Sequence, residues 1–212
     1  MIDFLLRPDI LITSLFSEYG LFACAIFFLI IFCETGLIIT PFLPGDSLLF
    51  MVGALFVRFS DGGGVAGLIL LSTGAAISAI LGDAVNYAIG YKIGPVIFAK
   101  KETRFLNRSH LDRAHLFYQL HGGKTIVMAR FIPIIRTFAP FVAGMGKMAY
   151  WRFAVYNVAG GIAWVFLFIF GGYFFGNVPM VKNNLTLVIL AIIVISILPG
   201  VVEFARTRKG NP

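Results

Sequence analysis

The sequence is short of charge. Only 13% of its 212 residues are Asp, Glu, Lys or Arg, whereas a soluble domain of average composition carries roughly a quarter. Hydrophobic residues make up 59% of the chain, and its mean hydropathy is +0.92. This composition argues against a soluble domain and predicts one integral membrane domain built from helices.

Cysteine and enzyme signatures are also scarce. Cys24 and Cys33 lie inside the first apolar stretch, where they are poor candidates for a disulfide and lack metal-ligand spacing. The chain contains no Walker-type loop, no G-x-S-x-G nucleophile motif and no H-E-x-x-H zinc motif. We therefore expect a protein that is not an enzyme and that uses neither a metal nor a cofactor.

The net charge of +7 is concentrated in two places. Basic residues cluster in a central segment and at the C-terminal end: Lys92, Lys100, Lys101, Arg104, Arg108, Arg113 and Lys124, then Arg206, Arg208 and Lys209. Lys and Arg beside apolar spans report membrane orientation, so we expect no nucleic-acid partner and place both clusters in the cytoplasm.

Four apolar runs are long enough to cross a bilayer, which takes about 20 helical residues. They lie at about 18–37, 66–91, 150–176 and 183–202, within a membrane domain predicted at 18–202. Residues 1–17 are predicted to form an interfacial segment, 98–121 a cytoplasmic amphipathic helix, and 203–212 a basic tail. Counting spans from the cytoplasmic central segment places both termini in the cytoplasm.

Two further apolar segments, 38–57 and 125–146, are interrupted by helix breakers: Pro41, Pro44 and Gly45 in the first, Pro133 and Pro140 in the second. Backbone freed by proline at membrane depth must be buried in protein or line a wet cavity. We interpret both segments as re-entrant helical hairpins that enter from opposite sides. Because G-Y-x-x-G follows each hairpin and span, at 90–94 and 172–176, the chain is predicted to be an all-α inverted repeat.

Four ionisable residues lie in or beside these hairpins: Glu34, Asp46, Arg130 and Arg136. Charge inside a membrane is costly, about 2.5–3.5 kcal/mol per residue on insertion scales. The four charges sum to zero, so a bound phosphate would add uncompensated negative charge. Burial favours a neutral carboxyl group, so protonation of one acid as the anion enters would restore the balance. Ion pairing that only pins the hairpins together is the alternative.

A polar stripe runs along the predicted span 66–91. Asp83, Asn86 and Tyr87 recur at helical spacing and share a face, as either cavity-lining residues or satisfied bundle residues. On span 150–176 the shared face holds Asn157, Gly160, Gly161, Trp164 and Gly171. We interpret this face, with its small residues, as a site of close helix packing.

Long motifs in this sequence resemble the DedA membrane proteins, a family also named for the VTT or SNARE-associated Golgi domain. The matching stretches are E-T-G-L-I-I-T-P-F-L-P-G-D at 34–46, G-D-A-V-N-Y-A-I-G-Y-K-I-G at 82–94, H-G-G-K-T-I-V-M-A-R-F-I-P-I-I-R-T-F-A-P-F-V-A-G at 121–144 and N-x-x-G-G-x-x-W at 157–164. The sequence is similar to enterobacterial members tied to envelope stress, alkaline pH and drug tolerance.

The resemblance implies a multi-pass protein of the bacterial inner membrane that moves undecaprenyl phosphate or phospholipids between leaflets and depends on proton-motive force. It carries the family's functional acids onto Glu34 and Asp46, as proton acceptors, and the functional arginines onto Arg130 and Arg136, as phosphate ligands. The leading interpretation is a flippase that returns undecaprenyl phosphate to the cytoplasmic face, with membrane lipids and protons as its partners. A phospholipid scramblase, a small-cation/proton antiporter and a non-transporting assembly factor are the alternatives. The lipid, the direction of transport and association into homo-oligomers stay open.

Overall fold

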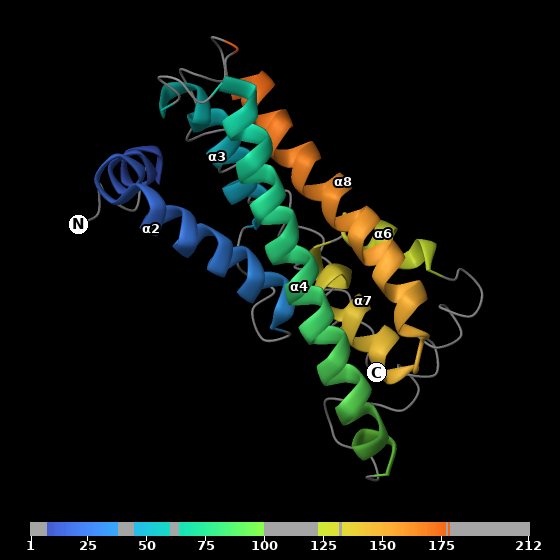
Figure 1. The fold of residues 1–212 in the computed structure, drawn as a ribbon. Helices are drawn as coiled ribbons and strands as arrows, with labels where there is room; N and C mark the ends of the chain where they lie inside the picture. Colours follow the sequence, from blue (N-terminus) through green and yellow to red (C-terminus); the bar gives the residue numbers. More distant parts are fainter. Residues whose placement is uncertain are drawn as a thin grey trace, which may run out of the picture. The chain divides into compact units, whose positions relative to one another are not determined.

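The computed structural model describes residues 8–37, 45–59, 64–99, 123–131, 133–176 and 178, and every secondary-structure element in these ranges is a helix (Figure 1). In chain order the helices are α2 (Pro8–Gly36), α3 (Gly45–Phe59), α4 (Gly64–Ala99), α6 (Lys124–Ala129), α7 (Pro133–Met145) and α8 (Tyr150–Gly176). The expectation of an all-helical fold is therefore confirmed for the part of the chain that the structure describes.

The long apolar runs form long helices. α8 has the bounds predicted for its span, and α4 contains the predicted span 66–91 and continues to Ala99. Within them, Gly64–Ile93 and Tyr150–Gly176 are long and apolar enough to cross a membrane. α2 is kinked at Gly20, whose φ of 36° suits glycine, and the apolar part after the kink matches the predicted span 18–37. The predicted span 183–202, the basic tail and residues 100–121 of the predicted amphipathic helix lie outside the described residues.

The second predicted hairpin is a pair of helices with a break between them. α6 ends at Ala129, the chain turns at Arg130, and α7 begins at Pro133 and contacts α6. Proline suits a first helical position because its fixed φ is helical and its missing N–H has no intrahelical partner there. In the first predicted hairpin, Gly45 is the first residue of α3, whereas Pro41 and Pro44 lie outside the described residues.

The prediction that Pro140 breaks the second hairpin is wrong. Pro140 lies inside α7, which continues to Met145. A proline removes one helical hydrogen bond and crowds the preceding turn, but it does not have to end a helix. Here Pro140 and its neighbours Ala139 and Phe141 are buried, so tertiary packing holds the helix together around it.

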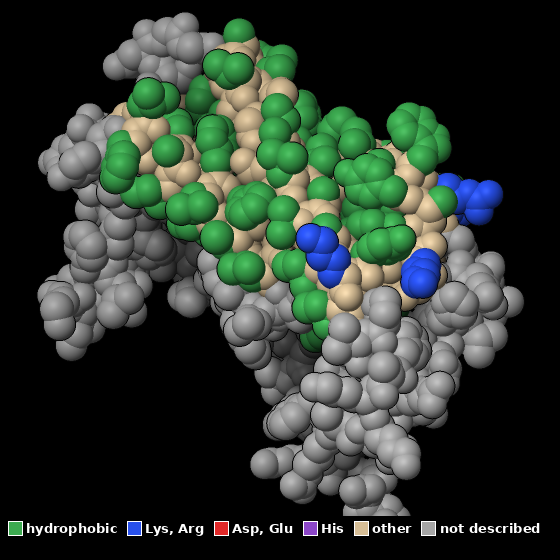
Figure 2. All heavy atoms as spheres, turned by 60° about the horizontal axis from the view of Figure 1, so that its bottom comes forward, with side chains coloured by type: hydrophobic (Ala, Val, Ile, Leu, Met, Phe, Trp, Pro, Cys, Tyr) green, Lys and Arg blue, Asp and Glu red, His purple; other side chains and the backbone are tan. Residues whose placement is uncertain are grey.

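The outer surface of these helices is apolar. Large hydrophobic side chains are strongly exposed on α2, α4 and α8, among them Leu21 (88%), Leu70 (75%) and Leu167 (60%). Figure 2 shows such side chains spread over one face of the molecule. A water-facing surface would leave this apolar area unfavourably hydrated, so the pattern fits helices that face lipid.

The chain divides into two compact units. The first comprises Met1–Ile30, Phe42–Ala76 and Val165–Pro212, and the second comprises Ile31–Pro41 and Ile77–Trp164. The long helices α2, α4 and α8 therefore each contribute to both units. In the first unit α3 packs on the C-terminal half of α8, with Leu49, Leu55 and Ile169 among its buried residues.

Each unit contains a pair of helices in reciprocal glycine contact. In the first unit, a Cβ built on Gly53 of α3 would collide with the Ile169 carbonyl oxygen of α8, and one built on Gly172 with the Phe50 carbonyl oxygen. The second unit repeats this arrangement between α7 and α4: Gly144 faces the Tyr87 carbonyl oxygen and Gly90 faces the Phe141 carbonyl oxygen. The contacting residues have the same spacing in both units, with each glycine three positions after the carbonyl residue of its own helix.

Candidate functional site

Among the described residues, four side chains with opposite charges are buried within the second unit. Glu34, Asp83, Arg130 and Arg136 have relative exposures of 0%, 1%, 2% and 4%. They come from the end of α2, the middle of α4, the turn after α6 and the first turns of α7. Two negative and two positive charges sum to zero, which limits the cost of burying them in apolar surroundings.

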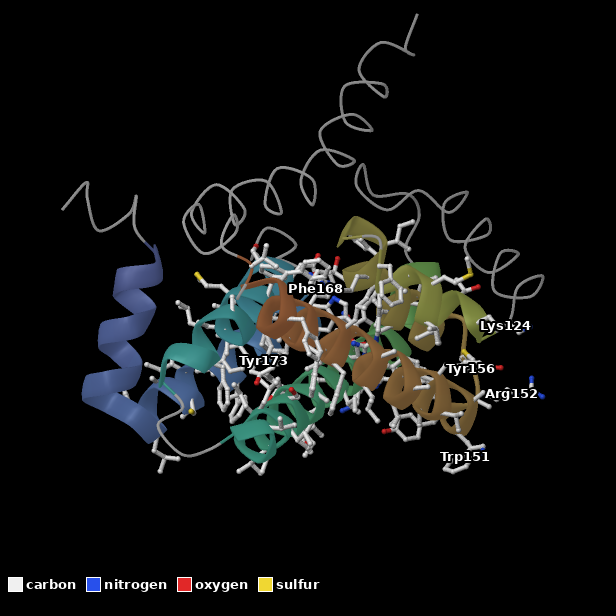
Figure 3. All side chains as sticks on the ribbon, turned by 90° about the horizontal axis from the view of Figure 1, so that it is seen from above. Lys124, Trp151, Arg152, Tyr156, Phe168 and Tyr173 are labelled. Atoms are coloured by element: carbon white, nitrogen blue, oxygen red, sulfur yellow. The ribbon has the colours of Figure 1, made fainter. Side chains whose placement is uncertain are left out.

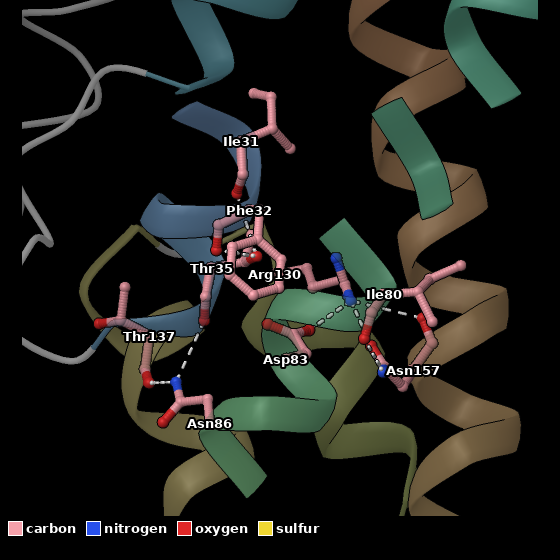
Figure 4. Close-up of polar contacts among 9 residues, drawn as sticks. All are labelled: Ile31, Phe32, Thr35, Ile80, Asp83, Asn86, Arg130, Thr137 and Asn157. Carbon is pink, nitrogen blue, oxygen red and sulfur yellow. Dashed lines mark hydrogen bonds and ion pairs between the residues drawn. The ribbon is translucent and has the colours of Figure 1, made fainter. Parts of the chain in front are cut away.

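Arg130 pairs with Asp83. Its Nη2 donates hydrogen bonds to Asp83 Oδ2 and to Asn157 Oδ1 of α8, and it lies 3.4 Å from the Asn157 carbonyl oxygen (Figure 4). Asn157 is fixed in turn, because its Nδ2 donates to the Ile80 carbonyl oxygen at 3.0 Å. Glycines make room for the guanidinium: a Cβ on Gly160 would lie 3.0 Å from Arg130 Cδ, and one on Gly161 3.4 Å from Nη2.

Two of the three guanidinium nitrogens of Arg130 make no hydrogen bond to the described residues. Its Nε and Nη1 are buried and have no hydrogen-bond partner among the described residues, and the same holds for Asp83 Oδ1. A buried donor without a partner costs about 1–3 kcal/mol, and more when it is charged. The fork of donors on a guanidinium matches the oxygens of phosphate and carboxylate groups. This arrangement therefore provides donor capacity for an anion at Arg130.

Arg136 pairs with Glu34. Arg136 Nη2 donates a hydrogen bond to Glu34 Oε1, which joins the start of α7 to the end of α2. The guanidinium carbon lies 4.7 Å from the ring centroid of Trp164, which is fully buried in α8. A cation over an indole face is attracted by the ring quadrupole. Arg136 is thus held by a carboxylate and an aromatic ring from two other helices.

Asn86 connects three helices beside these pairs. Its Nδ2 donates to the Thr137 carbonyl oxygen of α7 at 2.7 Å and to the Thr35 carbonyl oxygen of α2 at 3.2 Å (Figure 4). Thr35 turns its hydroxyl back to the Ile31 carbonyl oxygen at 3.1 Å. Close helix approach supports this junction, since Gly36 of α2 lies against Gly82 of α4. Asn86 therefore fixes the end of α2 and the start of α7 on α4.

The structure brings together most, but not all, of the predicted site residues. Glu34, Arg130, Arg136, Asp83 and Asn86 lie in the second unit. Asp46 is a buried residue in the first turn of α3, which belongs to the first unit. Tyr87 lies elsewhere in the second unit, where its hydroxyl donates to the Met148 carbonyl oxygen and its ring stacks on Phe153. The neutral charge set of the second unit thus contains Asp83, whereas the predicted set contained Asp46.

Sequence reasoning missed the residues that hold the arginines. The sequence predicts helix packing for the face that holds Asn157, Gly160, Gly161 and Trp164, yet all four lie against Arg130 or Arg136. Their common spacing on one face of α8 was the available signal. Spacing identifies a shared face, but it cannot say which side chain from another helix meets that face.

Comparison with known proteins gives a consistent result. A family model described as the VTT domain matches residues 43–174. Protein DedA of Escherichia coli K12 is 54% identical over 99% of this chain and 94% of the relative. A membrane protein of Mycobacterium tuberculosis H37Rv is 40% identical over 96% of this chain and 90% of the relative. The inner membrane protein YqjA of E. coli K12 is 31% identical over 88% of this chain and 86% of the relative. No solved structure matches the chain.

Proposed function

The chain belongs to the DedA family of bacterial inner-membrane proteins, which carry the VTT domain, and from that premise we propose that it is a lipid transporter driven by proton-motive force. In this proposal it moves undecaprenyl phosphate or a related lipid phosphate between the leaflets of the inner membrane and so supports envelope integrity. The transporter moves the lipid whole, and no covalent bond is made or broken.

The observation that carries the proposal is the pair of buried arginines in the second unit. Arg130 and Arg136 are each paired with a carboxylate, and Arg130 keeps two buried donors without a partner among the described residues. A lipid phosphate that binds there brings negative charge into a set whose charges already balance. Transfer of a proton to a carboxyl group offsets that charge, which couples the phosphate to the proton.

Three acids are available as proton acceptors. Glu34 and Asp46 are the acids that the family pattern predicts, and both are buried. Asp83 is the third candidate, because it forms an ion pair with Arg130. Protonation of an acid that pairs with an arginine would release that arginine to bind phosphate, so Glu34 acts on Arg136 and Asp83 acts on Arg130 in the proposed cycle.

We further propose that α3 and α7 are corresponding parts of an inverted repeat of re-entrant hairpins. The reciprocal glycine contacts support this, because they join α3 to α8 and α7 to α4 with the same spacing. The helix break between α6 and α7 places Arg130 at interrupted backbone, where transporters of this type bind their substrates. The topology, with both termini in the cytoplasm, belongs to the same proposal.

The test is transport by purified protein in sealed vesicles that contain labelled polyprenyl phosphate and labelled phosphatidylethanolamine, with and without a pH gradient. We expect gradient-dependent movement of the polyprenyl phosphate and little movement of phosphatidylethanolamine. Movement of both lipids without a gradient would identify a scramblase. Proton-coupled cation flux without lipid movement would identify an antiporter, and no flux of any kind an assembly factor.

The matched variants are Arg130→Lys and Arg136→Lys. Each keeps a positive charge but replaces the planar fork of donors with a compact ammonium. If the guanidinium binds phosphate, polyprenyl phosphate movement falls in both variants, although the charge balance of the site is unchanged. Wild-type rates in both variants would contradict the assignment of the arginines as phosphate ligands.

A further inference from the structure

The exposed charges that the structure describes in the second unit all have one sign. Among the residues whose side chains the structure describes, four charged ones are exposed, and all are basic and lie in this unit: Lys92, Lys124, Lys147 and Arg152. The described acids Glu34, Asp46 and Asp83 are all buried. On the face in Figure 2, blue basic side chains stand among hydrophobic ones, and no acidic side chain is visible.

Aromatic packing brings Lys92 and Lys147 to the same end of the unit. Lys92 lies on α4 just after Tyr87, whose hydroxyl donates to the carbonyl oxygen of Met148, the residue after Lys147. The Tyr87 ring also stacks on Phe153 at 4.5 Å and meets the Tyr150 ring edge-on at 5.6 Å. The part of α4 that precedes Lys92 is therefore fixed against the beginning of α8.

Lys124 and Arg152 reach this end from α6 and α8. Gly123, at the beginning of α6, lies against the Tyr156 ring of α8, so Lys124 begins its helix beside that ring. Arg152 is one turn before Tyr156 on α8. Figure 3 shows Lys124, Tyr156, Arg152 and Trp151 together at this end of α8. The four cations thus come from four chain segments, and the contacts of Tyr87 and Gly123 bring these segments to the beginning of α8.

The backbone of Lys147 is unusual. Its φ is 51°, a left-handed conformation that glycine adopts far more readily. The turn is a Schellman motif that ends α7, in which Lys147 N–H donates to the Gly144 carbonyl oxygen at 2.9 Å and Met148 N–H to that of Ala143 at 3.0 Å. Glycine is the usual residue at this position. Lys147 therefore presents a charged side chain at a position where the backbone alone favours glycine.

We propose that this end of the second unit binds the headgroup of an anionic phospholipid. Lys92, Lys124, Lys147 and Arg152 supply positive charge with no exposed acid among the described side chains to oppose it. Trp151, 77% exposed, supplies the aromatic ring that favours the boundary between headgroups and acyl chains. A free phosphate ion would leave that ring in water, whereas a phospholipid covers it. The site is separate from the buried arginines and does not depend on transport.

The two tryptophans make the proposal measurable. Trp151 is at the proposed site, whereas Trp164 is fully buried. We would reconstitute the full-length protein with brominated phosphatidylglycerol or brominated phosphatidylcholine and compare quenching of tryptophan fluorescence, with Trp151→Phe giving the background from Trp164. We expect the anionic lipid to quench Trp151 at several-fold lower mole fraction. Each cation replaced by glutamine should weaken that preference by about fivefold at low salt.

Matched variants test the role of Lys147. Lys147→Arg keeps the cation and should keep the preference for phosphatidylglycerol. Lys147→Gly suits the left-handed backbone and should fold at least as well as the wild type, but it should weaken this preference because the cation is lost. Equal quenching by both lipids in the wild-type protein would overturn the proposal. So would an unchanged preference in Lys147→Gly, or full competition by millimolar inorganic phosphate.

Discussion

Arg130 and Asp83 form an ion pair that joins the turn after α6 to the middle of α4, with side-chain exposures of 2% and 1%. Asp83 engages only one nitrogen of the guanidinium, and Nε and Nη1 have no partner among the described residues. The pair therefore links two helical segments and also leaves two guanidinium nitrogens able to donate hydrogen bonds to a ligand.

Arg130→Met should destabilise the protein by about 3–5 kcal/mol, because it leaves Asp83 charged and buried without its partner. The double variant Arg130→Met with Asp83→Leu should recover most of that loss, since an apolar pair of similar volume can replace a buried ion pair. Thermal unfolding in detergent at a fixed scan rate would measure both variants. The double variant should remain inactive in lipid transport, and recovery of transport along with stability would show that Arg130 has only a structural role.

Glu34→Gln should remove the response of transport to a pH gradient. The amide keeps the shape of the carboxyl group and can still accept a hydrogen bond from Arg136, but it cannot take up a proton. Rates of polyprenyl phosphate movement in vesicles with and without a gradient would measure the response. Asp83→Asn and Asp46→Asn provide the comparison: the acid that carries the proton is the one whose neutral variant abolishes the gradient dependence. A response preserved in all three variants would contradict proton coupling at these acids.

The sequence predicts most of the helices because their signals are local. A largely apolar run that begins at Tyr150 and ends at Gly176, without a proline, defines α8, and Pro133 defines the start of α7. Pro140 shows the limit of such signals, since buried neighbours decide whether a proline interrupts a helix.

The partners within the site depend on tertiary structure. Asp83 and Tyr87 lie one turn apart on the same face of α4, yet one meets Arg130 and the other meets Met148 and Phe153. Helical spacing shows which side of the helix a side chain faces. It does not show which residue of a neighbouring helix that side chain meets at a given position along the axis. For the same reason, the choice of Asp83 as the partner of Arg130 could not be predicted from charge alone.

Asn86→Leu should destabilise the second unit by about 1–3 kcal/mol. The substitution removes the hydrogen bonds to the carbonyl oxygens of Thr35 and Thr137, and both acceptors are buried. Asn86→Asp with a charged carboxylate should lower the stability more than Asn86→Leu does, because the carboxylate would face the two carbonyl oxygens with no hydrogen to donate. Thermal unfolding of both variants would test the order. A larger loss in Asn86→Leu than in Asn86→Asp would contradict the assignment of Nδ2 as the donor that joins the helices.

Neighbouring glycines on α8 offer a matched test of the reciprocal contacts. Gly172→Ala should destabilise the protein by about 1–3 kcal/mol, because the added Cβ would overlap the Phe50 carbonyl oxygen and force α3 away from α8. Gly171→Ala should be neutral or stabilising, since a Cβ there meets no atom within 4 Å and alanine favours the helix.

The corresponding change in the second unit is Gly90→Ala, where the added Cβ would overlap the Phe141 carbonyl oxygen. If the two contacts are equivalent parts of a repeat, Gly90→Ala and Gly172→Ala should cost similar amounts in thermal unfolding. The two losses should also add in the double variant, because each contact lies within its own unit. A large loss of thermal stability in Gly171→Ala would show that this part of α8 does not tolerate an added methyl group even where there is space for it. The contact with Phe50 would then no longer explain the effect at Gly172.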